Sequence, residues 1–279
     1  IECHRKAYEA WLGSDHDHAM EPADERSVLG DFDHAEFTYY DVTSRFYRDG
    51  DRFMVRTDGE DGKLHDYELA YVFGVYPLQQ YLLPLSRGRL QALSIAWNSR
   101  PEDQGGQRWF HLYPDENIAY DDELHWTGPA QNWNSMCAEG HSTHLENNYD
   151  PAERVFSTRW SESDVSCEAC HGPGSDHVIW AERKSGWDRL EANKGLAIVL
   201  DERKDVQWRI DPKTGNASRS KHRGSDKEIE MCARCHSRRS PISSDYVHGA
   251  PLLDHYLPRN LDQGMYFADG QINDEVYVY

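Results

Sequence analysis

Two pentapeptides of the same form carry the residues best suited to chemistry in this chain. Residues 167–171 read Cys-Glu-Ala-Cys-His, and residues 232–236 read Cys-Ala-Arg-Cys-His. In a Cys-x-x-Cys-His motif, the two thiols add across the vinyl groups of a haem, and the adjacent His presents a ring nitrogen to the iron. The recurrence predicts covalent c-type haem attachment at Cys167, Cys170, Cys232 and Cys235, with His171 and His236 as iron ligands.

Two further stretches look like incomplete copies of this motif. Cys3-His4 would be completed by a Cys just before Ile1, so we expect a processed or truncated chain. Residues 137–141 read Cys-Ala-Glu-Gly-His, in which Gly140 replaces the second Cys while Cys137 and His141 keep their spacing. A sequence error and a site without haem both remain open here. We interpret both copies as haem motifs, because each of the six Cys then belongs to one.

This interpretation predicts four c-type haems in 279 residues, one of them held through a single thioether at Cys137. His4 and His141 are then the remaining proximal ligands. The mean hydropathy is −0.86 and only 38% of residues are hydrophobic, so aliphatic side chains alone would give a thin core. Four haems would supply the missing apolar mass. Nine Trp and sixteen Tyr suit such packing, although they suit an ordinary β domain equally.

The chain has a formal net charge of −19. This charge disfavours nucleic acid and anionic membranes as partners and leaves positively charged partners open, although such acidity commonly serves only solubility. No apolar run is long enough for a transmembrane helix. Because covalent haem attachment takes place outside the cytoplasmic membrane, we expect a periplasmic, cell-surface or extracellular protein.

The sequence suggests an α+β fold of three segments: a haem segment over residues 1–31, a β-rich subdomain over 32–113, and a multihaem segment over 114–279. The middle segment lacks Cys and contains β-type runs such as 37–40, 45–47, 52–57, 67–73 and 90–97, separated by Gly-containing turns. We expect an antiparallel meander or small sandwich, more as scaffold than as docking surface. Short helices are predicted at residues 3–12, 176–184 and 226–231, in a loop-rich fold around stacked haems.

Eleven of the fifteen His lie outside the motifs, enough to give every iron a second imidazole. Most of them should be ordinary surface or capping residues. His16 and His177 are the first distal candidates because each follows a motif after a short break, and His125 and His255 come next. His18, His111, His144 and His248 are held in reserve. Bis-His ligation suits fast electron transfer, because a six-coordinate iron changes little in geometry on reduction.

Several stretches resemble a family of multihaem c-type cytochromes often joined to tetratricopeptide repeats. They lie at residues 3–20, 73–81, 105–115, 124–128, 167–175, 232–240 and 248–258. The resemblance implies haem c as the cofactor and electron transfer as the activity, and family members tend to continue with further motifs. In the family the motif at 137–141 usually keeps both Cys, so Gly140 departs from it. The Cys-His-Gly-Pro-Gly-x-x-His element at 170–177 is also similar, locally, to cytochromes related to hydroxylamine oxidoreductase and nitrite reductase.

We therefore expect an electron-transfer protein rather than an enzyme: a tetrahaem cytochrome with redox protein partners. Homo-oligomeric or head-to-tail assembly into an extracellular haem relay is compatible with the sequence. The alternative is a reductase of nitrogen or sulfur oxyanions with one open haem. A structural zinc site with four thiolates is allowed by the Cys spacing but leaves the motif His unexplained. A thioredoxin-like pair lacks its βαβ surroundings.

Overall fold

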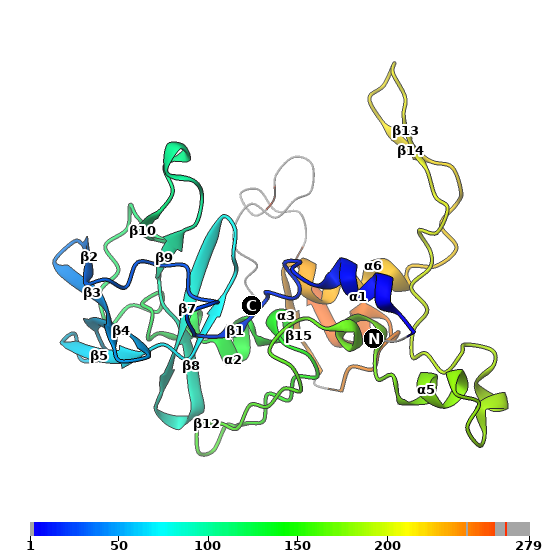
Figure 1. Cartoon of the computed structure of the whole chain (residues 1–279), viewed down its shortest axis with the longest axis horizontal. Helices are drawn as coiled ribbons and strands as arrows, with labels where there is room; N and C mark the ends of the chain where they lie inside the picture. Colours follow the sequence, from blue (N-terminus) through cyan, green and yellow to red (C-terminus); the bar gives the residue numbers. More distant parts are fainter. Residues whose placement is uncertain (1–2, 244, 260–265, 267–279) are drawn as a thin grey trace. The chain divides into compact units, whose positions relative to one another are not determined.

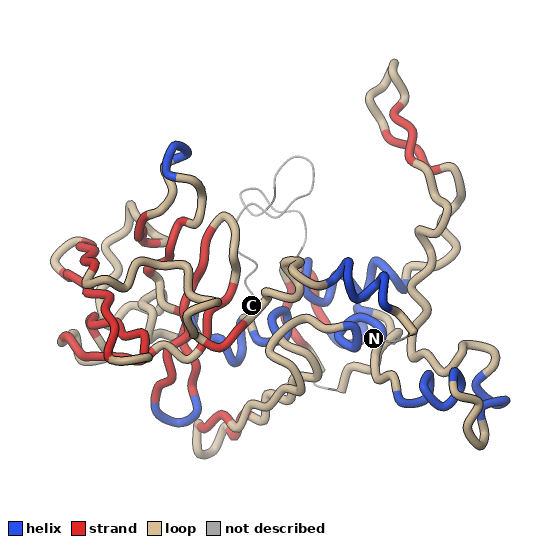
Figure 2. The backbone as a smooth tube through the Cα atoms, in the orientation of Figure 1, coloured by secondary structure: helices blue, strands red, loops and turns tan. Residues whose placement is uncertain are grey.

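The computed structural model describes residues 3–243, 245–259 and 266, and the chain divides into two compact units (Figure 1). Unit 1 is Ile1–Ser166 and unit 2 is Cys167–Tyr279. Unit 1 is dominated by antiparallel strands, whereas unit 2 combines short helices with long loops (Figure 2). This organisation confirms the predicted α+β, loop-rich fold class. The predicted three-segment division stays a prediction.

Unit 1 begins with an antiparallel meander that follows the chain order. Its strands are β2 (Ala35–Tyr39), β3 (Val42–Asp49), β4 (Arg52–Asp58) and β5 (Leu64–Glu68). The turns between β3 and β4 and between β4 and β5 contain Gly50 and Gly62, with φ of 63° and 69°. Glycine adopts such positive φ values without a steric penalty, which explains why the Gly-containing turns separate these strands.

A second antiparallel sheet has the strand order β1-β6-β7-β9-β10. Strand β8 also belongs to it and pairs with β7 outside this order. Its strands are β1 (Glu21–Pro22), β6 (Tyr71–Phe73), β7 (Leu78–Leu85), β8 (Arg89–Ala92), β9 (Ile95–Asn98) and β10 (Arg108–His111). The β-type run at 67–73 therefore contributes to both sheets. The chain crosses between them where Leu69 N–H donates to Phe53 O and Ala70 N–H donates to Leu82 O, each at 2.9 Å.

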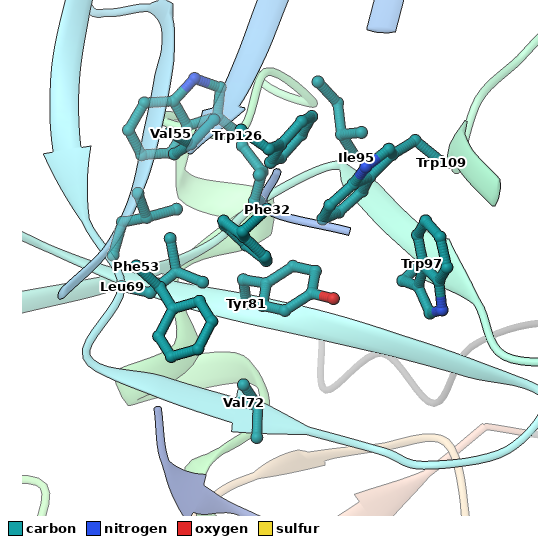
Figure 3. Close-up of a cluster of buried hydrophobic side chains, with 13 residues drawn as sticks. Phe32, Phe53, Val55, Leu69, Val72, Tyr81, Ile95, Trp97, Trp109 and Trp126 are labelled. Carbon is teal, nitrogen blue, oxygen red and sulfur yellow. The ribbon is translucent and has the colours of Figure 1, made fainter. Parts of the chain in front are cut away.

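The two faces of the second sheet are buried in different clusters. Tyr81 and Leu83 of β7 enter the main core, whereas Leu82 between them enters a second cluster, as expected when successive strand residues point to opposite faces. The main core is rich in aromatic rings, and Figure 3 shows many of them around Phe32 and Tyr81. It comprises Phe32, Phe46, Phe53, Val55, Leu69, Val72, Tyr81, Leu83, Leu93, Ile95, Trp97, Trp109 and Trp126.

The second cluster joins this sheet to the region of Cys137. It comprises Met20, Phe73, Leu82, Ala92, Trp133 and Ala138. Trp133 and Ala138 belong to α2 (Trp133–Met136) and α3 (Ala138–His141), the short helices on either side of Cys137. The β-rich subdomain thus acts as a packing surface for one of the predicted haem motifs.

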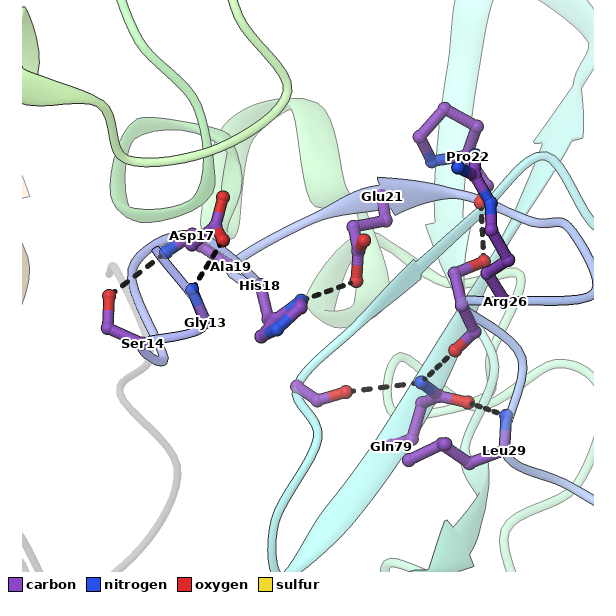
Figure 4. Close-up of polar contacts among 12 residues, drawn as sticks. Gly13, Ser14, Asp17, His18, Ala19, Glu21, Pro22, Arg26, Leu29 and Gln79 are labelled. Carbon is purple, nitrogen blue, oxygen red and sulfur yellow. Dashed lines mark hydrogen bonds and ion pairs between the residues drawn. The ribbon is translucent and has the colours of Figure 1, made fainter. Parts of the chain in front are cut away.

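The N-terminal segment of unit 1 is fixed at several points. Helix α1 (Arg5–Trp11) lies within the predicted helix, and Trp11 Nε1–H donates to Val165 O at 2.9 Å. Further along, buried Gln79 donates to Ser27 O at 2.8 Å and accepts from Leu29 N–H at 2.8 Å (Figure 4). These contacts anchor residues 27–29 to β7.

The rest of unit 1 consists of loops with short elements. These are η1 (Ser86–Gly88), η2 (Glu102–Gln104), η3 (Pro129–Gln131), β11 (Tyr149–Asp150) and β12 (Val155–Phe156). Within the described residues of the whole chain, no helix is long and apolar enough to cross a membrane.

Unit 2 consists of short helices and strands that are separated by loops. They are α4 (Cys167–His171), α5 (Ser175–Ala181), η4 (Trp187–Leu190), β13 (Trp208–Ile210), β14 (Ala217–Arg219), α6 (Lys227–His236), β15 (Arg239–Pro241), α7 (Leu252–His255) and β16 (Tyr256–Pro258). The two complete Cys-x-x-Cys-His motifs occupy α4 and the end of α6. Gly172, with φ of 74°, ends α4, and a Cβ there would lie 2.8 Å from the Ala197 side chain.

Candidate haem-attachment sites

A network of buried amides fixes the position of Cys137. Asn132 caps the start of α2 by accepting from Ser135 N–H at 3.1 Å, and its own amide donates to Gln91 Oε1 at 2.8 Å. Asn134 Oδ1 accepts from Leu90 N–H at 2.7 Å. Because Leu90 and Gln91 belong to β8, these bonds hold α2 against the sheet edge. Cys137 follows α2 directly, so the sheet determines where its thiol lies.

A backbone carbonyl and an aromatic ring hold His141 in one orientation. Its Nδ1 lies 2.6 Å from Ala19 O, so Nδ1 carries the proton and donates it to that carbonyl. The tautomer then leaves Nε2 as the nitrogen with a lone pair, and a hydrogen bond of this kind commonly orients metal-binding His residues. The Phe73 ring meets the imidazole edge-on, with 5.3 Å between ring centroids. Burial lowers the pKa of His141, which favours the neutral imidazole that binds iron.

The incomplete motif at Cys3 and His4 is exposed. Cys3 and His4 both lie at the surface, just before α1, and His4 O accepts from Tyr8 N–H at 3.0 Å. Residues 1 and 2 lie outside the described residues. The prediction that Cys3 and His4 belong to a haem motif is compatible with their position at the start of a helix.

The two complete motifs of unit 2 contact each other directly. Arg234, in the motif at 232–236, donates from Nη1 to the carbonyl of Ala169, in the motif at 167–171, at 3.4 Å. His248 Nε2 lies 3.2 Å from the same carbonyl oxygen. Burial raises the pKa of Cys170, and the nearby sulfurs of Cys232 and Cys167 raise it further while Arg234 lowers it. Thiols of the two motifs are therefore close enough to interact electrostatically.

The Arg234 side chain is also held from the other side. Its guanidinium lies 4.3 Å from the centroid of the Tyr246 ring, a cation–π contact. Sequence reasoning missed Arg234 and the Ala169 carbonyl, because nothing in a Cys-x-x-Cys-His pattern says which groups at the variable positions meet another motif. It also missed the Ala19 carbonyl at His141 for the same reason.

The first two distal candidates lie in different units. His16 is exposed in unit 1, and its backbone carbonyl accepts from Val165 N–H at 3.0 Å. His177 is on α5 in unit 2, where its Nδ1 donates to Lys194 O at 2.7 Å and its ring stacks on Trp180. A carbonyl thus holds Nδ1 of His177 as another holds Nδ1 of His141. Both distal assignments stay predictions.

The other two candidates have more polar contacts. Buried His125 has its Nδ1 2.8 Å from Thr127 Oγ1 and its Nε2 3.2 Å from Asp58 Oδ2. Binding of iron by His125 would require the loss of one of these contacts. His255 Nδ1 lies 3.3 Å from Ser243 Oγ and 3.6 Å from Asp245 Oδ1. The roles of His125 and His255 also stay predictions.

Reserve candidates occupy varied surroundings. His18 Nδ1 lies 2.9 Å from the Glu21 carboxylate. Figure 4 marks this contact with a dashed line. His111 is buried in the β-rich subdomain, and His144 Nδ1 lies 3.3 Å from Ser161 Oγ. His248 contacts the Ala169 carbonyl described above.

The six cysteines form neither disulfides nor part of a compact metal site within the described residues. None of the six forms a disulfide, and all six lie in the described part of the chain. Over residues 3–243, 245–259 and 266, no group of three or more His, Cys, Asp or Glu side chains gathers closely enough to hold a metal ion. Four cysteines in a zinc site would form such a group. The paired thiols, each with its following His, fit haem c instead.

One comparison with known proteins agrees with these motifs. Residues 109–172 match the family model described as cytochrome c554 and c-prime, a stretch that contains the motifs at 137–141 and 167–171. The comparisons with curated proteins and with solved structures gave no match. The match covers less than a quarter of the chain. Together with the motif chemistry, it supports a c-type cytochrome, with haem c as cofactor and electron transfer as its activity.

Proposed function

We propose that this protein is a tetrahaem c-type cytochrome that carries single electrons through closely packed bis-His haems outside the cytoplasmic membrane. Each motif then contributes thiols and one His, and further His residues complete the iron coordination. Bound haem c supplies a one-electron couple between ferric and ferrous iron. The protein's part is to set the spacing, the ligands and the local electrostatics.

The observation that carries this proposal is the contact between the two motifs of unit 2. Arg234 on α6 donates to the Ala169 carbonyl on α4, and the sulfur of Cys232 is close enough to contribute to the raised pKa of Cys170. Groups attached at these thiols are therefore neighbours. Close spacing of redox centres is the main requirement of an electron relay, whereas a carrier of isolated haems has no need of it.

The local electrostatics also suit this role. Arg234 places a cation beside both motifs, where it helps to balance the acidic chain of net charge −19. The acidic surface would favour redox partners with positively charged docking faces. A place in a head-to-tail haem assembly is compatible with the proposal and would extend the relay beyond one chain.

Optical and low-temperature EPR spectra of the oxidised holoprotein test the proposal. We expect low-spin signals only, unchanged by added nitrite or cyanide, because every iron has two imidazole ligands. A high-spin signal that responds to these anions would contradict the relay and support the reductase alternative, in which one haem is open.

The distal assignment is tested by a matched pair of variants. His177→Ala should convert one low-spin haem to a high-spin form that binds cyanide. His65→Ala is the control, because His65 is exposed on β5 and contacts Asp61 at 2.8 Å, far along the sequence from any motif. An unchanged spectrum for His177→Ala would remove His177 from the set of ligands.

A further inference from the structure

A cavity of about 240 Å³ lies in the β-rich part of unit 1, away from every motif cysteine. Its walls come from the turn between β2 and β3, the end of β4, the residues between β8 and β9, and the loop over residues 117–126. Ile95 and Trp126, labelled in Figure 3, connect it to the main core. From the sequence alone, we expected this region to act more as a scaffold than as a docking surface.

One wall of the cavity is a chain of hydrogen-bonded polar side chains. His125 Nε2 donates to Asp58 Oδ2 at 3.2 Å, and Thr57 Oγ1 donates to Asp58 Oδ1 at 3.2 Å. Ser44 Oγ lies 2.7 Å from Thr57 Oγ1. Both carboxylate oxygens of Asp58 thus have protein donors, so this wall does not need a ligand cation.

Two groups on the wall have hydrogen-bonding capacity to offer. His111 Nδ1 accepts from Tyr113 N–H at 3.1 Å, so in the neutral ring the proton is on Nε2, which is a donor. Burial lowers the pKa of His111 to about 4, so the ring stays neutral at pH 7. Ser94 is only 3% exposed, and its buried hydroxyl has no hydrogen-bond partner among the residues that the structure describes. A buried hydroxyl without a partner is costly unless a ligand or water satisfies it.

The remaining lining excludes anions and favours a ring. No Lys or Arg is among the residues that line the cavity, all of which the structure describes, and its acidic members are Asp41 and Asp58. Tyr39, Tyr40 and Tyr120 supply aromatic surface, with Tyr39 stacked on His111 at a centroid distance of 3.6 Å. An anion entering this site would lose its hydration without meeting a compensating cation.

From this combination we infer that the cavity binds a small neutral ring compound bearing hydroxyl or carbonyl oxygen, of the hydroxyarene or quinone class. The ring packs against the tyrosines, and its oxygen accepts from His111 Nε2–H and pairs with the Ser94 hydroxyl. A neutral ligand of this class satisfies both polar groups and leaves the Asp58–His125 pair intact. No motif residue lines this cavity, but the distal candidate His125 and the reserve candidate His111 do, so the inference assigns both side chains to the cavity rather than to an iron.

Equilibrium dialysis of the full-length holoprotein with phenol tests the inference, with benzoate as an anionic probe of similar ring size. We expect saturable binding of phenol to one site, and at least tenfold weaker binding of benzoate. Equilibrium dialysis measures binding alone, so the test does not depend on a redox reaction of phenol. Absence of saturable phenol binding, or equal binding of benzoate, would overturn the assignment.

Two variants test the location of the binding site, and a third is a control for a substitution at the surface. Ser94→Val removes the hydroxyl, and Ile118→Trp fills the cavity from its loop side, so each should weaken phenol binding at least tenfold. Thr43→Val changes an exposed residue of β3 that does not line the cavity and should bind as the natural chain does. Circular dichroism and melting temperature establish that each variant is folded. Unchanged binding in folded Ile118→Trp would contradict this location.

Discussion

His141 shows what the residue types of a motif can and cannot tell. The spacing in the sequence identifies Cys137 and His141 as a thiol and a ligand, and the structure adds the partner of the ligand. That partner, Ala19 O, is a backbone carbonyl 122 residues away. A carbonyl has no sequence signature, so only the fold reveals that the His141 ring is oriented before any iron binds.

Gly140 gives a test at the same motif. Gly140→Cys restores the second thiol, and we expect a second thioether at this haem. Saturating another vinyl group shortens the conjugated system, so the α band of the pyridine haemochrome should move to shorter wavelength. The Gly140 N–H bond to Cys137 O, at 3.0 Å, shows backbone geometry that a cysteine can adopt in this helical turn.

Glu139→Gln is the matched control for that substitution, since it changes the neighbouring residue without adding a thiol. Its α band should stay where the natural protein has it. If Gly140→Cys also leaves the band unchanged while all other haems are present, then no haem is attached at Cys137.

Among the elements, the strands themselves were predicted better than their grouping into sheets. Gly-containing turns and β-type runs correctly indicated an antiparallel β-rich region. The run at 67–73 nevertheless divides between two sheets at Leu69 and Ala70, because each residue bonds to a different strand. Such a crossing depends on tertiary packing, which local pattern does not encode. Helix α6 is longer than the predicted 226–231 because it includes the motif itself.

The contact between β8 and α2 is the element-scale feature that supports Cys137. Asn134 is 2% exposed, accepts from Leu90 N–H at 2.7 Å and donates to Thr158 Oγ1 at 2.9 Å. Asn134→Ala removes the acceptor of Leu90 N–H and one of the two bonds of Thr158 Oγ1, and should lower stability by about 1–3 kcal/mol. The melting temperature of the holoprotein, followed by circular dichroism, measures the effect.

Asn216→Ala serves as its control, because Asn216 is exposed at the β13–β14 turn and such substitutions change stability by less than about 0.5 kcal/mol. Equal melting temperatures for the Asn134 and Asn216 variants would show that the amide network does not hold α2 on the sheet.

At the scale of the whole molecule, the excess of carboxylates affects stability. Asp164 is half-buried, and its pKa is raised to about 6 by burial first and then by the charges of Glu162, Asp17 and Glu21. The folded chain therefore binds this proton more tightly than the unfolded chain. The stability contributed by Asp164 is full below about pH 4, falls as the pH rises towards 6, and stays low above it.

Asp164→Asn should remove the loss of stability that the ionisation of Asp164 causes as the pH rises towards 6. We expect its melting temperature at pH 7.5 to exceed that of the natural protein by about 2–4 °C, for a gain on the order of 1 kcal/mol after allowance for solvent screening. At pH 4 the difference should vanish. Asp103→Asn, at an exposed position, is the control and should show no such pH-dependent gain. A gain that is equal at both pH values would contradict the assigned protonation.

Composition and motifs together predicted the class of molecule, but not its internal contacts. The six Cys and their following His residues pointed to haem c, and the acidic composition argued against nucleic acid. The contact of Arg234 with Ala169 joins residues 65 positions apart, and the β-rich cavity gathers residues from 39 to 126. Both depend on how distant segments meet, which a single sequence does not specify.

In the proposed tetrahaem cytochrome, all four motifs, two of them incomplete, carry covalent haem. Intact-mass spectrometry of the holoprotein counts the covalently attached haems in one measurement. We expect a single species with the mass of four haems added, and peptide mapping should place one haem on the peptide that contains Cys137. A mass corresponding to two haems, confined to Cys167–Cys170 and Cys232–Cys235, would contradict it.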